Sequence, residues 1–505
     1  MDPLIAVFTA SNFTTTMQRI SRLIILLWLG TIYDAGGQYS RLAYFLDIPQ
    51  NRFLNPAIRP SDSLYIGLPI ISGAGFSIDN NFLRYHDVIN KKNDSVSTVN
   101  DQGFNTTNLL AHTRKKNLLE TDVFIQIAGV AFKAWDGYLF IDINDRMGLD
   151  ADVPGDLIRL SVIDPDAYKG ERFNLSEANA GIYYFREAGI GYSWNQTSGL
   201  RAGFKIKLLA GMGSVYSELR NWEVGISETA YSTSADVDVN VSAPLKVNYK
   251  NNGMIDEVDL KREESINTIL LKRGIKPGLA LDIGTTWVAT DRISLSASIT
   301  DLGFIRWGKD NTTFRINEDF DFRGFNVTDP NGDNSINAIG DRFLDSIQRL
   351  VKINILHYPF SRVIPASVYT GAEYSLSKNV SLGLLSRTRF ITGNIKQSVT
   401  LTATLNSQNV SATIGYTAAN RTYNNLGAGF ALRVGPFQLY LISDRIPFLW
   451  DRIDTGNRDI IFPEQWNTFD LRAGLNLLFN KTKKGSDCIF PYRNEIKTGR
   501  NKQRS

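Results

Sequence analysis

The sequence predicts an all-β protein, a transmembrane antiparallel β-barrel of about fourteen strands with long extracellular loops that contain short helices. Three observations support this fold. Long stretches alternate apolar and polar residues, short and long connections between the stretches alternate along the chain, and tryptophans fall at the stretch ends. Strands of an outer-membrane barrel show this pattern because their side chains face lipid and lumen in turn.

The alternation is clearest in TFDLRAGLNLLF at 468–479. Phe469, Leu471 and Leu475 share one face of a strand there, while Asp470 and Arg472 share the other, because successive side chains point to opposite faces. Similar stretches predict the other strands. The predicted strands are 64–76, 122–133, 136–146, 182–195, 198–213, 275–288, 292–306, 364–377, 379–392, 396–405, 409–418, 425–434, 436–446 and 467–480.

The connections fall into two alternating classes. Tight turns are expected at 134–135, 196–197, 290–291, 378, 407–408 and 435. The links at 77–121, 147–181, 214–274, 307–363, 393–395, 419–424 and 447–466 are mostly long. Outer-membrane barrels have short periplasmic turns and longer extracellular loops, so the tight turns are predicted to face the periplasm. Within the long links, 254–274 and 339–351 show partly helical apolar spacing and are candidate external helices.

Six tryptophans lie near predicted strand ends and are predicted to form two aromatic girdles, since amphipathic rings prefer membrane interfaces. Trp135, Trp194 and Trp287 lie beside tight turns, and Trp307, Trp450 and Trp466 lie toward the opposite rim. The alternative is that these rings fill cores near turns.

Charged residues within the predicted strands lie on the polar face. An arginine on the lipid face at mid-membrane would cost about 2–4 kcal/mol. The signs are mixed, which favours a salt-bridged network that packs the interior over a selective polar pore. The predicted lumen-facing charges are Glu187, Arg201, Lys205, Lys207, Asp282, Glu373, Arg387, Arg389, Arg433, Asp444, Asp470 and Arg472. A soluble secreted β-sandwich, whose strands also alternate, is a minor alternative fold.

Four segments are predicted along the chain. Residues 1–37 are a signal peptide, in which Arg19 and Arg22 precede a short apolar run and small residues follow it; Met17 is a possible true start. A buried core helix is the alternative for that run. Residues 38–63 form a periplasmic N-terminal segment, 64–480 the barrel, and 481–505 a basic periplasmic tail. The expected location is therefore the outer membrane of a Gram-negative bacterium.

Signals for chemistry are sparse. Cys488 is the single cysteine, so one chain has neither a disulfide nor a thiolate metal site. The three histidines, His86, His112 and His357, share no ligand spacing. The segment DPNGDNS at 329–335 has its glycine in the fourth place, where a calcium loop needs it in the sixth, which favours a surface turn. We expect no enzyme activity, no metal, no cofactor and no nucleic-acid partner.

The first predicted strand contains unusual backbone residues. Pro69 removes a ladder donor, and Gly67, Gly73 and Gly75 remove side chains, so a kink or a weak edge is expected. Such a defect is what a lateral gate toward lipid requires. A harmless bend where the barrel closes is the alternative.

Three stretches carry a family resemblance: FLDIPQNRFLNPAIRPSDSLYIGLP at 45–69, DLGFIRW at 301–307 and RAGLNLLF at 472–479. They resemble an uncharacterised outer-membrane barrel family typical of Bacteroidota, with an Asn-Pro-Ala box, here Asn55, Pro56 and Ala57. The chain is more distantly similar to the long-chain fatty-acid transporter superfamily, which includes accessory barrels of the type IX secretion system. The resemblance implies a fourteen-stranded barrel in the outer membrane.

Two functions remain open at this point. The first is transport or capture of a hydrophobic small molecule through the lumen, with outer-membrane lipid around the barrel. The second is a non-transporting accessory barrel whose extracellular loops dock a protein partner in a secretion or envelope complex. A continuous tunnel favours the first function, and a lumen sealed by ion pairs favours the second.

Overall fold

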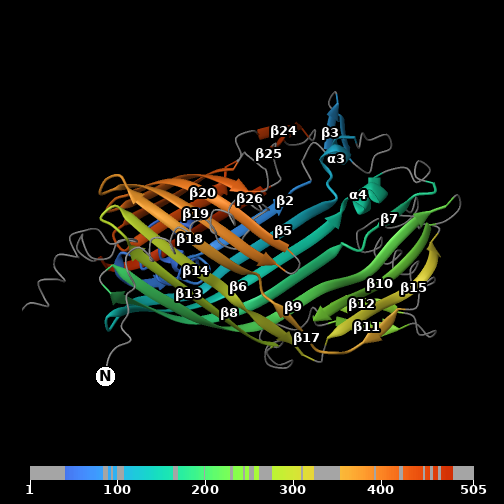
Figure 1. Ribbon diagram of the computed structural model, residues 1–505, viewed down its shortest axis with the longest axis horizontal. Coiled ribbons are helices and arrows are strands. Elements are labelled where there is room, and N and C mark those ends of the chain that lie inside the picture. Colours follow the sequence, from blue (N-terminus) through green and yellow to red (C-terminus); the bar gives the residue numbers. More distant parts are fainter. Residues whose placement is uncertain are drawn as a thin grey trace, which may run out of the picture.

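Fourteen antiparallel strands close into a barrel (Figure 1). The computed structural model describes residues 40–82, 89–92, 95–98, 107–162, 169–197, 199–227, 231–242, 245–249, 255–260, 276–308, 311–322, 353–391, 394–419, 425–446, 450–454, 459–463 and 468–481. The first barrel strand has two parts, β1 (Asp62–Gly67) and β2 (Ala74–Asn80). Both parts pair with β5 (Lys116–Ala134) on one side and with β26 (Thr468–Lys481) on the other, which closes the barrel.

The remaining barrel strands pair in chain order. Each predicted strand corresponds to one barrel strand, except that 64–76 is interrupted at 68–73, so the predicted fold is confirmed. Between β5 and β26 the order is β6 (Gly137–Pro154), β8 (Asn179–Thr197), β9 (Leu200–Ile226), β13 (Lys276–Val288), β14 (Ile293–Trp307), β18 (Ala366–Ser375), β19 (Val380–Ile391), β20 (Asn394–Asn406), β21 (Val410–Ala419), β22 (Leu426–Val434) and β23 (Phe437–Arg445).

The barrel is apolar outside and polar inside. On β26, Leu471 and Phe479 are exposed on the outer surface, whereas Asp470, Arg472 and Asn476 are buried in the interior. Other strands expose large apolar side chains in the same way, among them Ile190, Leu208, Leu281, Leu302, Leu401, Ile414 and Leu439. An apolar outer band around a polar interior is the arrangement of a barrel that lies in lipid.

The described part of the chain contains no helix that is both long and apolar enough to span a membrane. Its helices are short: α3 (Thr107–His112) and α4 (Gly155–Val162) lie in long connections, as expected.

Several strands continue past the barrel at the end opposite the tight turns (right in Figure 1). The outer part of β9, residues 214–226, pairs with β10 (Tyr231–Ser242), which pairs with β15 (Thr312–Phe322). The short strands β7 (Arg172–Asn174) and β16 (Asn354–Leu356) pair with β9 and β15. We call these five segments the external sheet. One face of it packs Phe173, Val224 and Ile226 together beside Leu157 and Leu160 of α4.

Small elements complete the described part. The strand β17 (Phe360–Val363) pairs with the end of β14. Three hairpins are β3 (Ile89–Lys92) with β4 (Ser95–Thr98), β11 (Leu245–Tyr249) with β12 (Ile255–Leu260), and β24 (Trp450–Asp454) with β25 (Asp459–Pro463).

The predicted external helix at 254–274 is wrong over its first residues, which form strand β12. Ile255, Val258 and Leu260 include β-branched residues that favour a strand, and β11 supplies a partner for their backbone. The candidate helix at 339–351, the segment 329–335, Cys488, His86, Trp466 and residues 1–37 lie outside the described residues.

The predicted girdle position of Trp307 is wrong. Asp301 has a positive φ of 62° and is buried next to buried Thr300, and the register of the facing strand shifts between Leu281 and Ile283. This bulge reverses the alternation of β14, because one extra residue moves all later side chains to the other face. Trp307 therefore points inward, is 1% exposed and stacks on Phe360.

The other described tryptophans lie near strand ends. Trp135 is 87% exposed and Trp287 is 45% exposed, both at the end with the tight turns. Trp194 is half-buried at the same rim, and its ring stacks on Tyr192. Trp450 begins β24.

An arginine on the outer surface tests the lipid contact. We expect Leu401→Arg, in the middle of β20, to reduce the free energy of unfolding in lipid vesicles by about 2–4 kcal/mol. The matched variant Leu405→Arg lies beside a tight turn, where the charge reaches the interface, and is expected to cost about 0–1 kcal/mol. Guanidinium titrations followed by tryptophan fluorescence measure both values. Equal losses of unfolding free energy in the two variants would contradict the placement of Leu401 in the middle of the bilayer and of Leu405 at its interface.

Candidate functional site

Residues 40–60, which we call the N-terminal plug, fill part of the barrel interior. The plug contains two short 3-10 helices, η1 (Leu42–Tyr44) and η2 (Pro49–Phe53). We expected 38–63 to lie in the periplasm, but residues 40–60 lie inside the barrel and residues 62–63 begin the wall strand β1. Almost every plug residue is buried, and its apolar side chains form one cluster with Phe124, Tyr369 and Tyr440 of the wall. Burial of this apolar surface explains why the segment enters the barrel.

Glycines in the wall make room for the plug. Four of them face inward, and at each one a Cβ atom would lie against a plug side chain, at 3.3 Å or less. The pairs are Gly371 with Tyr44, Gly383 with Phe45, Gly415 with Leu42 and Gly429 with Leu46. The sequence of strands β18 to β22 is therefore fitted to the shape of the plug.

The Asn-Pro-Ala box packs against two further glycines. Gly203 of β9 and Gly284 of β13 are direct cross-strand partners. A Cβ atom at Gly284 would overlap the Asn55 side chain, and one at Gly203 would overlap the Pro56 carbonyl. The box is thus a structural contact between plug and wall.

Asn55 satisfies its own polar atoms in this contact. Its Nδ2 donates to the Tyr44 hydroxyl at 2.9 Å and to the Thr285 carbonyl at 3.1 Å, and its Oδ1 accepts from the Ala57 N–H at 2.9 Å. A buried amide needs such partners, because an unsatisfied polar group costs about 1–3 kcal/mol.

Charged side chains fill the other side of the interior. Arg52 of the plug forms an ion pair with Asp142 of β6, and both side chains are at most 1% exposed. The Lys205 ammonium lies 3.4 Å from the Asp142 carboxylate and 3.7 Å from the Glu187 carboxylate. The Arg52 guanidinium also lies 4.7 Å from the centre of the Tyr65 ring.

The chain of charges continues across β6, β8, β9, β13 and β14. Arg146 lies 2.9 Å from Glu187 and 2.7 Å from Asp301, and Lys207 lies 2.7 Å from both Asp301 and Asp282. We call the whole set the central charge network. Its members are Arg52, Asp142, Arg146, Glu187, Lys205, Lys207, Asp282 and Asp301, four cations and four anions.

Smaller charge clusters lie elsewhere in the interior. Arg389 lies 3.3 Å from Glu120 and 3.4 Å from Asp122, and Lys396 also pairs with Glu120. Near the start of the plug, Asp444 accepts hydrogen bonds from the backbone and side chain of Arg41.

The structure buries all but one of the predicted lumen charges. Glu187, Lys205, Lys207 and Asp282 come together in the central charge network. Asp470 and Arg472 lie 3.4 Å apart, while Arg433 is half-buried at the rim and pairs with Asp62. Arg201, Glu373 and Arg387 are buried in other parts of the wall.

Sequence reasoning missed four members of the network. Asp142 and Arg146 alternate with Ile141 and Ile143, so the alternation of β6 could have identified them. Asp301 follows a bulge that the alternation does not reveal. Arg52 lies in a segment that we assigned to the periplasm.

The plug and the charged side chains occupy much of the described interior. Among the described residues no group of three or more histidine, cysteine or acidic side chains could hold a metal ion. Charges of both signs neutralise one another, so no path of a single sign runs through the network.

The interruption of the first strand is the weak part of the wall. Ile70 has a positive φ of 65°, and Ile70 and Ile71 are 61% and 56% exposed on the lipid side. The backbone still pairs on both sides: the Ile70 N–H donates to the Gln126 carbonyl at 2.9 Å, and the Leu475 N–H donates to the Ile71 carbonyl at 2.8 Å. The predicted kink is therefore present as a bulged, non-strand segment.

The plug supports this interruption from inside. The Ser72 carbonyl accepts from Gln50 Nε2 at 2.9 Å and from the Tyr440 hydroxyl at 3.0 Å. Behind it lies a small, mostly apolar cavity of about 20 Å³. Its lining is Ser40, Ala43, Ile48, Gln50, Phe53, Leu54, Ala74, Phe124, Tyr440, Ile442 and Arg472. A cavity of this size has room for about one water molecule.

Comparison with known proteins identifies a family. The model of a family of unknown function, DUF5723, matches residues 56–444, which is most of the chain. The chain belongs to DUF5723. This match includes Pro56 and Ala57 of the Asn-Pro-Ala box and ends at Asp444. No curated protein matches this DUF5723 chain.

Several solved barrels are similar to this DUF5723 chain at low identity. The toluene transporter TbuX of Ralstonia pickettii is 8% identical, with a TM-score of 0.42 over 88% of this chain and 98% of that one. A FadL homologue of Pseudomonas aeruginosa is 12% identical, with a TM-score of 0.38 over 90% and 99%. The translocator domain of NalP from Neisseria meningitidis is 8% identical, with a TM-score of 0.27 over 94% and 100%. The strand pairing described above defines the barrel fold of this chain independently of these similarities.

Removing one partner of the plug's ion pair tests the central charge network. We expect Arg52→Ala to reduce the free energy of unfolding by about 3–5 kcal/mol, because it leaves a buried carboxylate without its nearest cation. The double variant Arg52→Ala/Asp142→Ala is expected to lose less than the sum of the two single variants. Denaturant titration in detergent micelles measures these values.

The control for this prediction is a surface pair. Arg159 is exposed, Asp156 is half-buried and their charged groups lie 3.8 Å apart, so Arg159→Ala is expected to cost less than about 1 kcal/mol. An Arg52→Ala protein as stable as the control would show that the Arg52–Asp142 pair does not hold the plug.

Proposed function

We propose that this protein takes up a hydrophobic small molecule from the outer membrane through the interrupted first strand, with the N-terminal plug as the gate. The observation that carries the proposal is the bulged segment 68–73, which exposes Ile70 and Ile71 to lipid and is held from inside by Gln50 of the plug. The small apolar cavity lies near this segment, because its lining includes Ala74, which follows the segment, and Gln50 and Tyr440, which bind the Ser72 carbonyl. A ligand arriving from lipid meets apolar side chains on both sides of the wall.

In this proposal the structure represents the closed state. The cavity of about 20 Å³ is too small for an organic ligand, so uptake requires η2 to move away from the wall. Movement of η2 breaks the hydrogen bonds of Gln50 to the Ser72 carbonyl and to Asn476. The Ser72–Gly73 backbone then loses one of its two inner supports.

We further propose where the protein is located and how it is exported. The apolar outer band and the closed barrel support insertion in the outer membrane of a Gram-negative bacterium, and the N-terminal 37 residues are proposed to direct export as a signal peptide. We propose no catalytic role and no cofactor.

A reducible cross-link between plug and wall tests the gate. The Gln50 and Asn476 side chains are in contact, with Gln50 Nε2 2.8 Å from Asn476 Oδ1 and Asn476 Nδ2 3.1 Å from Gln50 Oε1. In a Cys488→Ser background, Gln50→Cys/Asn476→Cys is expected to block uptake of N-phenyl-1-naphthylamine into proteoliposomes when a short bis-methanethiosulfonate reagent links the two thiols, because the amide groups that the thiols replace leave a gap too long for a direct disulfide. Reduction is expected to restore the rate, because η2 is then free to move.

The two single-cysteine variants treated with the same reagent are the matched controls and are expected to retain uptake. Uptake by the cross-linked double variant at the rate of the controls would exclude the plug as the gate. A wild-type protein that takes up no dye above protein-free vesicles would exclude uptake of this class of ligand.

The filling of the interior supports a second candidate function, an accessory barrel that docks a protein partner. The central charge network and the plug occupy part of the lumen, and the alternative requires that they seal it. The external sheet provides a surface for such a partner (Figure 1).

A lumen filled by the plug and by charges of both signs predicts a specific electrical behaviour. Purified protein in planar bilayers is expected to show no steady ion conductance, because charges of both signs and the plug fill the path. Asp470→Ala and Arg472→Ala, beside the plug, are the companion variants. Steady wild-type channels whose size changes in these variants would show that the lumen conducts and would contradict the closed interior.

A further inference from the structure

Charged side chains cross the lumen near the end of the barrel opposite the tight turns. Arg389 of β19 lies 3.3 Å from Glu120 and 3.4 Å from Asp122, both of β5, and Lys396 of β20 also pairs with Glu120. Six barrel strands separate β5 from β19 in either direction around the barrel, when β1 and β2 are counted as one. These ion pairs therefore join opposite walls.

A further ion pair extends this contact. Asp150 of β6 is the cross-strand partner of Glu120, and it lies 3.0 Å from Arg362 of β17, a strand that pairs with β14. We call the six charged residues the outer bridge. Its members are Glu120, Asp122, Asp150, Arg362, Arg389 and Lys396, three anions and three cations.

The outer bridge lies between the plug and the end of the barrel opposite the tight turns. Phe124 of β5 packs on Phe53 of the plug and lies two residues from Asp122, on the side of the tight turn. On β19, Gly383 faces the plug, and Arg389 follows six residues later, about 20 Å further along the strand. A solute entering from that end meets the outer bridge before it meets the plug.

The side chains of the outer bridge are closely packed. Those of β5, β19 and β20 are at most 6% exposed. The cavity between Glu120, Asp150 and Lys396 has a volume of about 10 Å³, the lower limit for one water molecule. The Tyr183 hydroxyl of β8 also donates to the Asp122 carboxylate at 3.1 Å. Water therefore has little room among these side chains.

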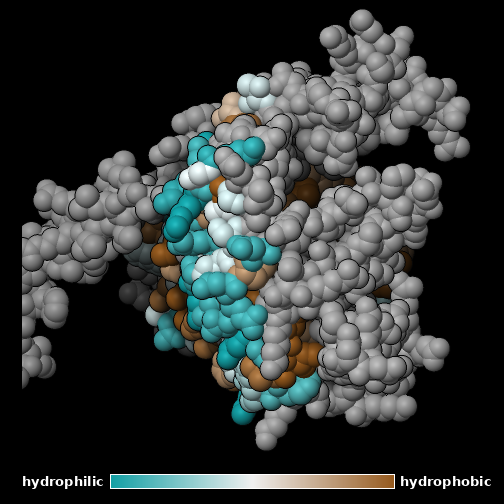
Figure 2. Space-filling view, turned by 90° about the vertical axis from the view of Figure 1, so that its right-hand side faces the viewer, coloured by the Kyte–Doolittle hydropathy of each residue, from teal (hydrophilic) through white to brown (hydrophobic). Residues whose placement is uncertain are grey.

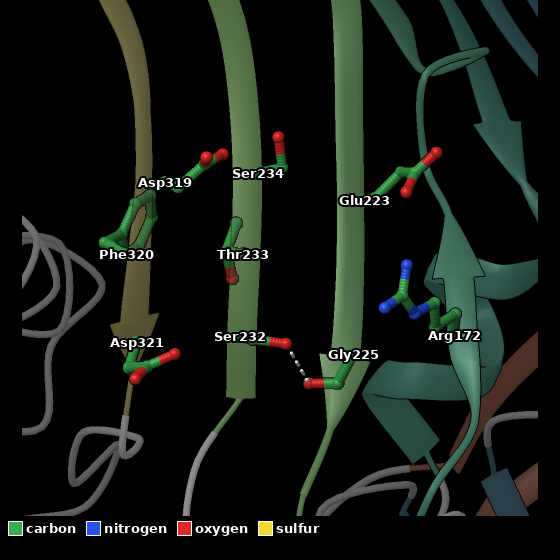
Figure 3. A pocket seen from close by; sticks show the side chains of 9 residues that line it. All are labelled: Arg172, Glu223, Gly225, Ser232, Thr233, Ser234, Asp319, Phe320 and Asp321. Atoms are coloured by element: carbon green, nitrogen blue, oxygen red, sulfur yellow. Dashed lines mark hydrogen bonds between the residues drawn. The ribbon is translucent and has the colours of Figure 1, made fainter.

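The described surface beyond the outer bridge is polar. Figure 2 looks at this end of the molecule and shows a broad hydrophilic area over its described part. The external sheet has an open cavity of about 550 Å³ across β7, β9, β10 and β15 (Figure 3). Its polar lining residues are Arg172, Glu223, Ser232, Thr233, Ser234, Asp319 and Asp321. A hydrophobic ligand gains little by leaving water for such a surface.

We propose that the outer bridge blocks entry into the lumen from the extracellular side, so that the hydrophobic ligand enters from lipid alone. Entry from lipid rests on the proposed uptake through the interrupted first strand, whereas the barrier itself does not depend on it. Opening the outer bridge leaves buried charges without partners, and an apolar ligand has no charge to replace them. Ile70 and Ile71 at the interruption instead offer the ligand an apolar surface in lipid.

Chemical modification of a cysteine beside the outer bridge tests the barrier. Ser398 follows Lys396 by two residues on β20, is 1% exposed, and has a hydroxyl with no hydrogen-bond partner among the described residues. In a Cys488→Ser background, Ser398→Cys is the reporter. Its reaction with 2-hydroxyethyl methanethiosulfonate, a neutral, water-soluble reagent, is measured on the full-length protein in detergent. We expect a rate at least tenfold below that of Ser407→Cys in an exposed turn.

Removal of the charges that join β5 to β19 and β20 tests whether the outer bridge protects the reporter. The variant Glu120→Ala/Asp122→Ala/Arg389→Ala/Lys396→Ala loses two anions and two cations, so the charge balance is kept. It is expected to raise the modification rate of Ser398→Cys at least tenfold, because it leaves a gap across the lumen. Circular dichroism confirms that the variant retains its β-structure.

Two matched variants control for a general loss of stability. Arg433→Ala/Asp62→Ala removes an ion pair near the tight turns and is expected to leave the modification rate within twofold. Arg389→Lys/Lys396→Arg keeps the charges of the outer bridge and is also expected to leave the rate within twofold.

A cross-link across the lumen tests the route of the ligand. In the Cys488→Ser background, Glu120→Cys/Lys396→Cys is linked by a bis-methanethiosulfonate reagent, which holds β5 and β20 together. We expect uptake of N-phenyl-1-naphthylamine within twofold of the two single-cysteine variants, because a ligand from lipid does not pass this level of the lumen. The link between Gln50→Cys and Asn476→Cys, in contrast, is expected to block uptake.

Four results would overturn the proposal. They are modification of Ser398→Cys as fast as that of Ser407→Cys, no faster modification in the four-alanine variant, an equal increase in the Arg433→Ala/Asp62→Ala control, and loss of uptake when the outer bridge is linked. A protein that takes up no dye would contradict the proposed function, while the modification rates still decide whether the outer bridge is a barrier.

Discussion

The structure depends on the need to fill the interior of a fourteen-stranded barrel whose walls turn their polar faces inward. An eight-stranded barrel is narrow enough for wall side chains to fill it, whereas porins of about sixteen to eighteen strands leave a water channel. Fourteen strands leave a space that wall side chains alone do not occupy. Here the N-terminal plug and the central charge network occupy it together.

The two halves of the interior are filled by different kinds of side chain. Along β18 to β22 the wall has glycines and hydroxyl residues, and apolar side chains of the plug pack into the space that they leave. Along β6 to β14 the wall carries charges, which are stable at this depth because each has a partner of opposite sign. A buried charge without a partner costs several kcal/mol, so the balance of four cations and four anions is a condition of the fold.

Alternation along the strands was sufficient to predict the barrel and the inward direction of most charges. Glu187, Lys205, Lys207 and Asp282 were identified because they share the parity of their strands' polar residues. Which charges meet depends on strand stagger around the barrel, and a single sequence does not reveal this. The bulge at Asp301 reversed the parity of Trp307, and such a bulge has no periodic signal.

The position of the plug is the largest difference between the predicted and the observed structure, and it too depends on contacts between distant parts of the chain. Its apolar residues follow no strand or helix period, since 3-10 turns and irregular backbone position them. Contacts with wall glycines more than 140 residues away define its path. Local pattern therefore indicates an apolar segment without showing what covers it.

Two plug residues connect the interrupted first strand to the central charge network. Gln50 supports the Ser72 carbonyl at the interrupted strand, and Arg52, two residues later in η2, pairs with Asp142. Because one short helical turn carries both residues, movement of η2 away from the wall also separates Arg52 from Asp142. Lys205, 3.4 Å from Asp142, is the cation that remains for that carboxylate. In the proposed uptake mechanism, the strength of this buried ion pair therefore contributes to the energy needed to open an apolar path.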